Sequence, residues 1–256
     1  MCRWAAWLGE PLYLEDLISC PGHSLIEQAS HATESKTAIN ADGVGIAWYG
    51  DRAEPGIYRD ILPAWSDPNL QSIAQSVKSP LFMCHVRAST GTATSRTNCH
   101  PFSYQNWSFM HNGQIGGFDA FRRRADGLIP DTLYGQRQGA TDSECLFLLA
   151  LSEGLVDDPK PALERATTKL HELSIAHGKA PHLRLSFGFS DGKRLYAVRH
   201  ASDEFVPTIY QRWSDKDGGR IVASEPLDGD NWDELPASSF VTFEGRDMQV
   251  ENFSPS

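Results

Sequence analysis

The sequence predicts an α+β fold in which antiparallel sheets carry segregated helices. Segments with strand patterns open and close the chain, and segments with helical patterns group between them. With 40% hydrophobic residues and 7 Trp among 256 residues, the chain can build a sizeable core and is too apolar to be disordered. No repeat, low-complexity block or linker divides the sequence, so we expect residues 1–256 to form a single domain.

Apolar runs bounded by turn residues predict the strands of the first half. Residues 2–8 form such a run at the very start of the chain, where a strand has to be tied into a sheet because free termini fray. Residues 107–110 lead into residues 111–113, which we expect to form a tight turn. The other strands predicted here cover residues 43–49 and 81–86.

The clearest helical signal begins at Thr141. The sequence Thr141-Asp142-Ser143-Glu144 matches a capping box, in which the Thr and Glu side chains satisfy backbone N–H groups at the start of a helix. Residues 145–151 continue from it as an apolar run. The other predicted helices cover residues 14–19, 25–30, 69–77 and 161–177.

After Pro181 the apolar pattern changes from the period of a helix to that of a strand. Residues 183–189 alternate between apolar and polar or small side chains, residues 190–193 supply a hairpin turn, and residues 195–198 return. The remaining predicted strands cover residues 208–211, 220–223, 239–243 and 248–252.

The charge balance argues against nucleic acid as a partner. The chain has 23 Lys and Arg against 33 Asp and Glu, a formal net charge of −10, whereas nucleic-acid binding needs clustered basic side chains. The basic cluster at residues 122–124 is expected to be a solvated face. No apolar run reaches the roughly 18 residues of a membrane span, and no secretion signal precedes the first strand. We therefore expect a cytoplasmic protein with no membrane partner.

The cysteines predict neither a disulfide framework nor a structural zinc site. They are 5 in number, widely spaced and without a CxxC pair, which fits a reducing compartment. The Cys-His pairs at residues 84–85 and 99–100 are poor candidates for metal ligands because adjacent strand residues point to opposite faces. We expect no metal and no cofactor.

Cys2 is a candidate nucleophile. A small residue after the initiator Met1 permits removal of that Met, which would leave Cys2 at the N-terminus. Such a residue carries both a thiol and an α-amino group, and the amine, with an ordinary pKa of about 7.7 to 8.0, can accept the thiol proton as a general base. Taken alone, a Cys at this position is more often chance.

Three further features offer polar groups for a substrate. Arg87 ends a strand pattern and could hold a carboxylate in bidentate fashion, although a structural ion pair is the simpler reading. Asn112 and Gly113 could donate to an oxyanion, although Asn-Gly is first of all a turn sequence. Asp142 could hold an ammonium group, although the helix dipole stabilises a carboxylate there without any ligand.

Together these features form one ordered pattern. The chain resembles the class II glutamine amidotransferases, whose glutaminase domain belongs to the N-terminal nucleophile (Ntn) hydrolases. The matching segments, in order, are Met1-Cys2-Arg3, Asp42-Gly43-Val44-Gly45, His85-Val86-Arg87-Ala88-Ser89-Thr90-Gly91, Asn98-Cys99-His100-Pro101-Phe102, His111-Asn112-Gly113 and Thr141-Asp142-Ser143-Glu144.

The resemblance implies a four-layer αββα sandwich, with two antiparallel sheets between helical layers. It also implies that Cys2 is the nucleophile and that Asn112 and Gly113 form the oxyanion hole. The expected reaction is hydrolysis of a γ-glutamyl amide through a γ-glutamyl thioester, with a small-molecule substrate.

The resemblance further implies how the glutamyl end is held. Arg87 would bind the α-carboxylate, Thr90 in the same motif would bind substrate beside it, and Asp142 would bind the α-ammonium. A zwitterionic amino acid needs one fixed cation and one fixed anion, which agrees with these residue types.

Several alternatives stay open at the level of sequence. The chain is most like the small stand-alone members, which include the ergothioneine-pathway γ-glutamyl amidohydrolase and the amidotransferase-like subunit of the glutathione-degradation complex. No acceptor domain is expected in 256 residues, so the chain either hydrolyses its substrate alone or serves a separate partner subunit, and it could be a homo-oligomer. An inert regulatory module of the same fold is a further alternative. A papain-like hydrolase using Cys84 or Cys99 with a His is the least supported.

Overall fold

The computed structural model describes residues 2–31, 40–89 and 93–255, which form two antiparallel sheets. The spatial order of the first, sheet A, is β11 (Asp233–Glu234), β9 (Tyr210–Ser214), β10 (Gly219–Ala223), β1 (Arg3–Tyr13), β4 (Lys78–Val86), β2 (Val44–Tyr49) and β3 (Gly56–Asp60). The spatial order of the second, sheet B, is β13 (Asp247–Asn252), β12 (Ser239–Glu244), β8 (Leu195–Ala201), β7 (Leu183–Ser190), β6 (Trp107–Ile115) and β5 (Phe102–Tyr104).

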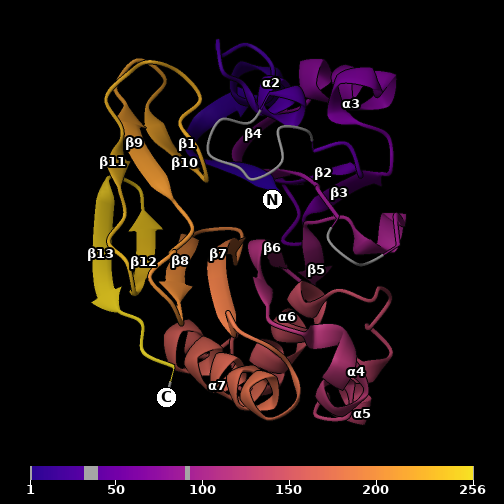
Figure 1. Ribbon diagram of the computed structural model, residues 1–256. Helices are drawn as coiled ribbons and strands as arrows, with labels where there is room; N and C mark the ends of the chain where they lie inside the picture. The colour runs from indigo at the N-terminus through magenta and orange to yellow at the C-terminus, as the bar shows by residue number, and fades with distance from the viewer. Residues whose placement is uncertain (1, 32–39, 90–92, 256) are drawn as a thin grey trace.

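Helices cover the outer face of each sheet. The helices packed on sheet A are α1 (Leu14–Ile18), α2 (Leu25–Ser30) and α3 (Pro68–Ser76). Those on the side of sheet B are α4 (Phe118–Asp126), α5 (Asp131–Tyr134), α6 (Asp142–Ser152) and α7 (Pro159–His177). Figure 1 shows α2 and α3 on one side of the molecule and α6 and α7 on the other, with the sheets between them. The predicted α+β fold and its four-layer αββα arrangement are confirmed.

Strand β1 explains why the chain can begin with a buried strand. It lies between β10 and β4, so both of its edges are hydrogen-bonded. Trp4 and Ala6 face the core between the sheets, whereas Ala5 and Trp7 face the helices. The Trp4 indole nitrogen donates to the carbonyl and hydroxyl oxygens of Ser186 on β7, each at 3.2 Å, which ties sheet A to sheet B.

The tight turn predicted at residues 111–113 is wrong. Strand β6 continues through these residues to Ile115, and β7 pairs with it as far as Ile115 opposite Leu183. The Asn-Gly sequence permits a turn, but a full-length partner strand keeps it extended, because the backbone groups are already paired in the ladder. Asn112 and Gly113 therefore lie within a strand.

Of the capping box predicted at Thr141, the structure contains the hydrogen bond of the Thr side chain but not that of the Glu side chain. The Thr141 side chain accepts the Glu144 N–H at 3.1 Å, as expected. The Glu144 carboxylate instead accepts the N–H groups of Gln138 and Gly139 and pairs with Arg137 at 2.7 Å. The helix end is thus fastened to the loop that precedes it, which holds the first turn of α6 in place.

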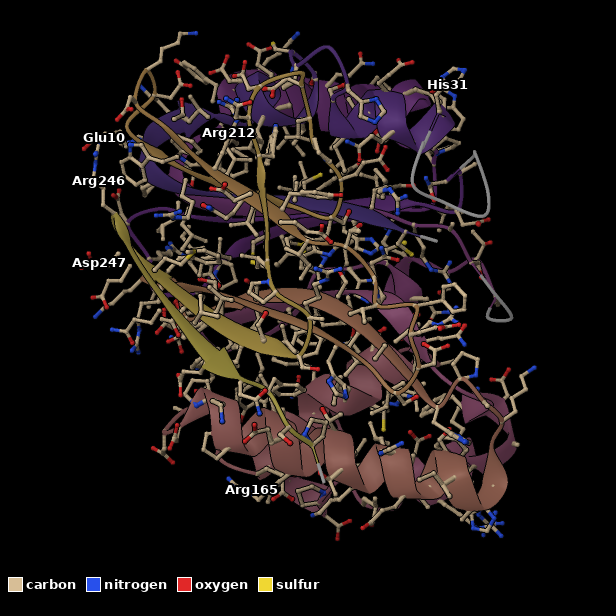
Figure 2. All side chains as sticks on the ribbon, turned by 60° about the vertical axis from the view of Figure 1, so that its left-hand side comes forward. Glu10, His31, Arg165, Arg212, Arg246 and Asp247 are labelled. Atoms are coloured by element: carbon tan, nitrogen blue, oxygen red, sulfur yellow. The ribbon has the colours of Figure 1, made fainter. Side chains whose placement is uncertain are left out.

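The basic cluster of residues 122–124 lies on the outside of the molecule. Arg122, Arg123 and Arg124 are exposed on α4, as predicted for a solvated face. Figure 2 shows labelled side chains such as Glu10 and Arg246 at the margin of the molecule. No helix within the described residues is long and apolar enough to cross a membrane.

Two short 3₁₀ helices, η1 (Ala64–Ser66) and η2 (Arg96–Asn98), complete the elements of the described chain.

Candidate active site

Four residues that the sequence singled out line one cavity of about 530 Å³: Cys2, Arg87, Gly113 and Asp142. They come from different parts of the fold, namely the residue before β1, the residue after β4, strand β6 and the first turn of α6. The two sheets and a helix N-terminus therefore contribute to the same cavity.

Cys2 is half-buried at the start of sheet A. The Ala88 N–H donates to its Sγ at 3.4 Å, and the Ala88 carbonyl oxygen lies 3.5 Å from the same sulfur. Burial raises the pKa of the Cys2 thiol, while the Ala88 N–H and the charge of Arg87 lower it. Because the thiol is the weaker nucleophile, this cysteine needs a nearby base, and its own α-amino group can supply one after Met1 is removed. Met1 itself lies outside the described residues.

Arg87 is buried at the end of β4. Its guanidinium donates to the Ser89 hydroxyl at 3.2 Å and to the carbonyl oxygens of Asp42 and Ala93, each at 3.4 Å. The Asp42 carboxylate in turn accepts the Ser89 N–H at 2.7 Å. These contacts hold the guanidinium at the cavity wall, where its planar donors suit a carboxylate. Thr90, the other residue predicted to bind substrate here, lies outside the described residues.

Asp142 is fixed by backbone and side-chain donors. Its Oδ2 accepts the Ile115 N–H at 2.7 Å, and its Oδ1 accepts the Ser143 N–H at 2.8 Å and the Ser143 hydroxyl at 3.2 Å. The carboxylate thus keeps one orientation in the cavity. A fixed carboxylate and a fixed guanidinium in one cavity suit the ammonium and carboxylate groups of an amino acid.

Gly113 is among the residues that line the cavity, whereas Asn112 is not. Gly113 lines it, and a Cβ at this position would come within 1.9 Å of the Arg184 carbonyl oxygen, so a larger residue does not fit. Asn112 is 3% exposed and, by strand alternation, lies on the face of Met110 between the sheets; it is not among the residues that line the cavity. Its Oδ1 is buried without a hydrogen-bond partner among the described residues. Burying an unpaired carbonyl oxygen costs free energy, and a hydrogen-bond donor of a bound ligand could pair with this oxygen.

Sequence reasoning assigned no role to three buried histidines at this site. His100 and His111 line the cavity, and the ring of His85 lies 4.3 Å from that of His100. Within the described part of the chain, both ring nitrogens of His100 are buried without a partner, whereas His111 Nδ1 lies 2.9 Å from the Ser143 hydroxyl. Burial lowers the pKa of each ring, to about 3 for His85, so all three are neutral near pH 7. All three belong to the matching motifs, but only the tertiary fold brings them together.

The papain-like alternative is not supported by the other candidate thiols. Cys84 is buried in the core between sheet A and its helices, where desolvation raises its pKa. Cys99 is also buried, and burial raises its pKa to about 11. Neither thiol lines the cavity. Across residues 2–31, 40–89 and 93–255, no group of three or more His, Cys, Asp or Glu side chains is placed to hold a metal ion.

Comparisons with known proteins identify the family of the chain. Residues 23–212 match the family described as glutamine amidotransferases class-II. The chain is 33% identical over 292 residues to the Saccharomyces cerevisiae protein named "Probable glutamine amidotransferase DUG3", covering 94% of this chain and 81% of that protein. It is 29% identical over 244 residues to the gamma-glutamyl-hercynylcysteine sulfoxide hydrolase of Mycolicibacterium smegmatis, covering 94% of this chain and 95% of the relative.

A solved structure extends the likeness to the fold. A glutamine aminotransferase class-II domain protein from Silicibacter pomeroyi superposes with a TM-score of 0.81 at 45% identity, covering 99% of this chain and 100% of the other. The fold and these relatives together define an amidotransferase-type enzyme. The chain belongs to the class II glutamine amidotransferases. The matched range 23–212 includes Arg87, Asn112, Gly113 and Asp142 but leaves out Cys2.

Proposed function

We propose that the chain hydrolyses a γ-glutamyl amide, with Cys2 as an N-terminal nucleophile. The observation that carries this proposal is the cavity in which Cys2 meets a buried guanidinium, Arg87, and a fixed carboxylate, Asp142. Those two charges match the α-carboxylate and α-ammonium of a glutamyl group, and binding them would place the side-chain amide at the thiol.

The first half of the reaction forms a thioester. The free α-amino group of Cys2 takes the proton of the thiol, and the sulfur attacks the γ-carbonyl carbon to give a tetrahedral oxyanion. Asn112 and Gly113 would donate hydrogen bonds to that oxygen, which requires the Asn112 amide to turn toward the bound substrate. Collapse breaks the C–N bond, and the α-ammonium returns its proton to the departing amine.

The second half releases glutamate. Water attacks the γ-glutamyl thioester, and the α-amino group of Cys2 again removes the proton. The tetrahedral intermediate collapses with cleavage of the C–S bond, and the thiol is regenerated. No metal or cofactor is needed in this sequence of steps.

Two relatives support a γ-glutamyl substrate in particular. One carries the name of a gamma-glutamyl-hercynylcysteine sulfoxide hydrolase, and the other that of a probable glutamine amidotransferase. We propose that this chain likewise cleaves a γ-glutamyl amide of a small molecule, either alone or together with a separate partner subunit.

The test is an amine-release assay with glutamine, glutathione and other γ-glutamyl amides. Intact mass first establishes that the protein begins with Cys2. Wild type should release glutamate and become heavier by one γ-glutamyl group during turnover, whereas Cys2→Ala should do neither while keeping the circular dichroism of wild type. Turnover by Cys2→Ala would disprove the mechanism. If processed wild type releases no amine, with or without a partner, the chain is an inert module of the same fold.

A further inference from the structure

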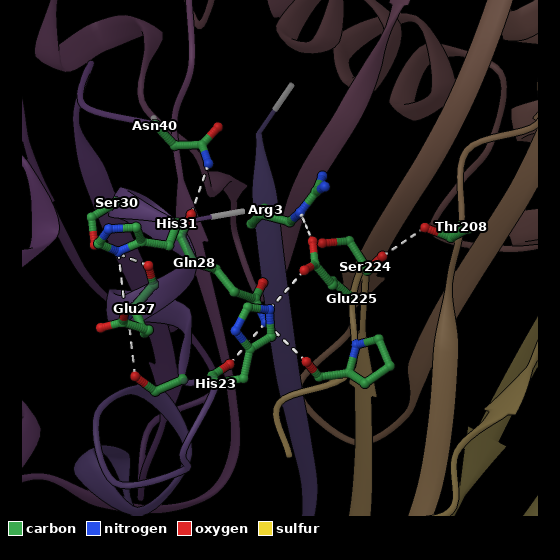
Figure 3. Close-up of polar contacts among 12 residues, drawn as sticks. Arg3, His23, Glu27, Gln28, Ser30, His31, Asn40, Thr208, Ser224 and Glu225 are labelled. Carbon is green, nitrogen blue, oxygen red and sulfur yellow. Dashed lines mark hydrogen bonds and ion pairs between the residues drawn. The ribbon is translucent and has the colours of Figure 1, made fainter. Parts of the chain in front are cut away.

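Arg3 follows the proposed nucleophile and has no part in the chemistry described so far. Its side chain is buried, although arginine is rarely buried unless it is paired. The Arg3 Nε lies 2.5 Å from Oε2 of Glu225, and Nη1 donates to the carbonyl oxygen of Cys2 at 3.0 Å. Figure 3 shows the guanidinium reaching Glu225 from the start of β1. One side chain thus links the nucleophile's backbone to a carboxylate distant in sequence.

Glu225 is itself held in place. It is 1% exposed, and its second oxygen, Oε1, lies 2.7 Å from Nε2 of His23. The backbone beside it is anchored from the segment around α2, since Gln28 Nε2 donates to the Pro226 carbonyl at 3.1 Å and the His23 N–H donates to the Leu227 carbonyl at 2.9 Å. Figure 3 shows His23 and Gln28 beside Glu225. Glu225 is therefore a fixed point and not a mobile surface carboxylate.

Cys2 needs such a support because the sheet ends before it. The pairing of β1 with β4 ends at Arg3 opposite Val86, and on the other edge Ser224 bonds to Trp4 through its N–H at 2.9 Å. Cys2 lies beyond these rungs, where chain ends usually fray. A misplacement of a reacting group by about 1 Å can lower a rate by about 100-fold.

We propose that Arg3 and Glu225 form a positioning pair that fixes the backbone of Cys2, and with it the thiol and the α-amino group, for attack on the substrate. The inference rests on the proposed function, because it concerns the same nucleophile. Arg3 would act through the Cys2 carbonyl without touching substrate. The planar guanidinium is suited to this task, since it can bond to the Glu225 carboxylate and the Cys2 carbonyl together, whereas a Lys ammonium lacks that fork.

The experiment compares wild type with Arg3→Met, Glu225→Gln, the double variant Arg3→Met/Glu225→Gln, and the milder Arg3→Lys and Glu225→Asp. The substrate is γ-glutamyl-p-nitroanilide, or the best amide from the release assay. Intact mass of each variant establishes that Met1 is gone, so a processing defect is not read as a positioning defect.

Arg220→Met is the matched control. Arg220 is a buried arginine on β10, beside Leu8 in the ladder, and it donates to the Arg246 carbonyl at 2.7 Å. Its loss removes a buried guanidinium from the same sheet without touching Cys2. Thermal denaturation of all variants separates lost stability from lost positioning.

We expect Arg3→Met and Glu225→Gln to lower kcat by about 100-fold with KM within about twofold of wild type. The double variant should be no slower than either single variant, because the two side chains act as one unit. Arg3→Lys should lose part of the rate, and Arg220→Met should lower Tm without changing kcat.

The inference is overturned if folded Arg3→Met turns over like wild type, or if Arg220→Met lowers kcat by the same factor as Arg3→Met for the same fall in Tm. Should the Met and Gln variants fail to fold, wild-type kcat in both Arg3→Lys and Glu225→Asp overturns it equally. An inactive, correctly processed wild type overturns the proposed function first, and this inference with it.

Discussion

At the scale of single residues, Asn112 offers the sharpest test of transition-state binding. Its Oδ1 is buried without a hydrogen-bond partner among the described residues, but this oxygen can only accept, so donation to the oxyanion has to come from the Nδ2 group of the same amide. Removing one oxyanion donor lowers turnover by about 100- to 1000-fold. We expect Asn112→Ala to lower kcat by that factor with little change in KM, measured by steady-state kinetics. An unchanged kcat with a raised KM would mean that Asn112 only contacts the ground state.

The glutamyl-binding roles of Arg87 and Asp142 can be separated from structural roles. If each binds one charge of the substrate, wild type with an α-carboxylate-blocked substrate should behave like Arg87→Ala with intact substrate. An N-acetylated substrate should likewise reproduce Asp142→Asn. The measurement is kcat/KM for both variants against intact and blocked γ-glutamyl amides, arranged as a double-variant cycle. Strict additivity between residue and substrate group would exclude direct contact.

At the scale of elements, the close pairing of β6 and β7 gives Gly113 a structural role besides its proposed role as an oxyanion donor. A Cβ there would come within 1.9 Å of the Arg184 carbonyl oxygen on β7. We expect Gly113→Ala to lower the free energy of unfolding by about 1 to 3 kcal/mol or more, measured by urea denaturation. Gly135→Ala is the control, because a Cβ at Gly135 has no atom within 4 Å. Asn112→Ala should not show this loss, and equal stability of the two glycine variants would contradict the packing argument.

The elements with clear periodicity were predictable from the sequence. Helix α7 was expected over residues 161–177 and spans Pro159–His177, and strand β12 was expected over residues 239–243 and spans Ser239–Glu244. Helix α4 was missed because it follows two glycines and buries only Phe118, Phe121 and Ala125. In edge strands such as β3 every residue is half-buried, so buried and exposed residues do not alternate along the strand and no pattern marks it in the sequence.

The site was predictable to the extent that its residues lie in local motifs. Cys2, Arg87, Gly113 and Asp142 were each found from neighbouring residues and do meet in one cavity. The Arg3–Glu225 pair could not be found in this way, because its partners are 222 positions apart in sequence. Pairing across a sheet depends on register, which a single sequence does not specify for distant strands.

At the scale of the whole molecule, the site lies where the two sheets come together. Sheet A supplies the start of β1 and the end of β4, and sheet B supplies β6, with the first turn of α6 beside it. The Trp4 indole, two residues from Cys2, bonds across to Ser186 on sheet B. The position of Cys2 relative to the cavity residues of sheet B therefore depends on how the two sheets pack.

The buried histidines at this junction make stability dependent on pH. The pKa of His85 is lowered to about 3 by burial, and burial also lowers the pKa of His100 well below its ordinary value of 6.5. Below pH 6.5 these rings bind protons more readily in the unfolded chain than in the folded chain, so the stability present above pH 6.5 is lost as the pH falls. For His85 the loss extends down to a pH of about 3, with a slope of about 1 kcal/mol per pH unit.

Replacing His100 by a residue that cannot be protonated should reduce that slope. We expect the free energy of unfolding of His100→Gln to fall less steeply than that of wild type as the pH falls below 6.5, because the buried His100 ring has a lowered pKa. Urea denaturation at a series of pH values measures both slopes. The contributions of the carboxylates are the same in both proteins, so they cancel when one slope is subtracted from the other. The control variant is His177→Gln, which makes the same substitution at an exposed position outside the cavity. Parallel curves for wild type and His100→Gln would mean that His100 takes up its proton over the same pH range in the folded and unfolded protein, which would contradict the argument from burial.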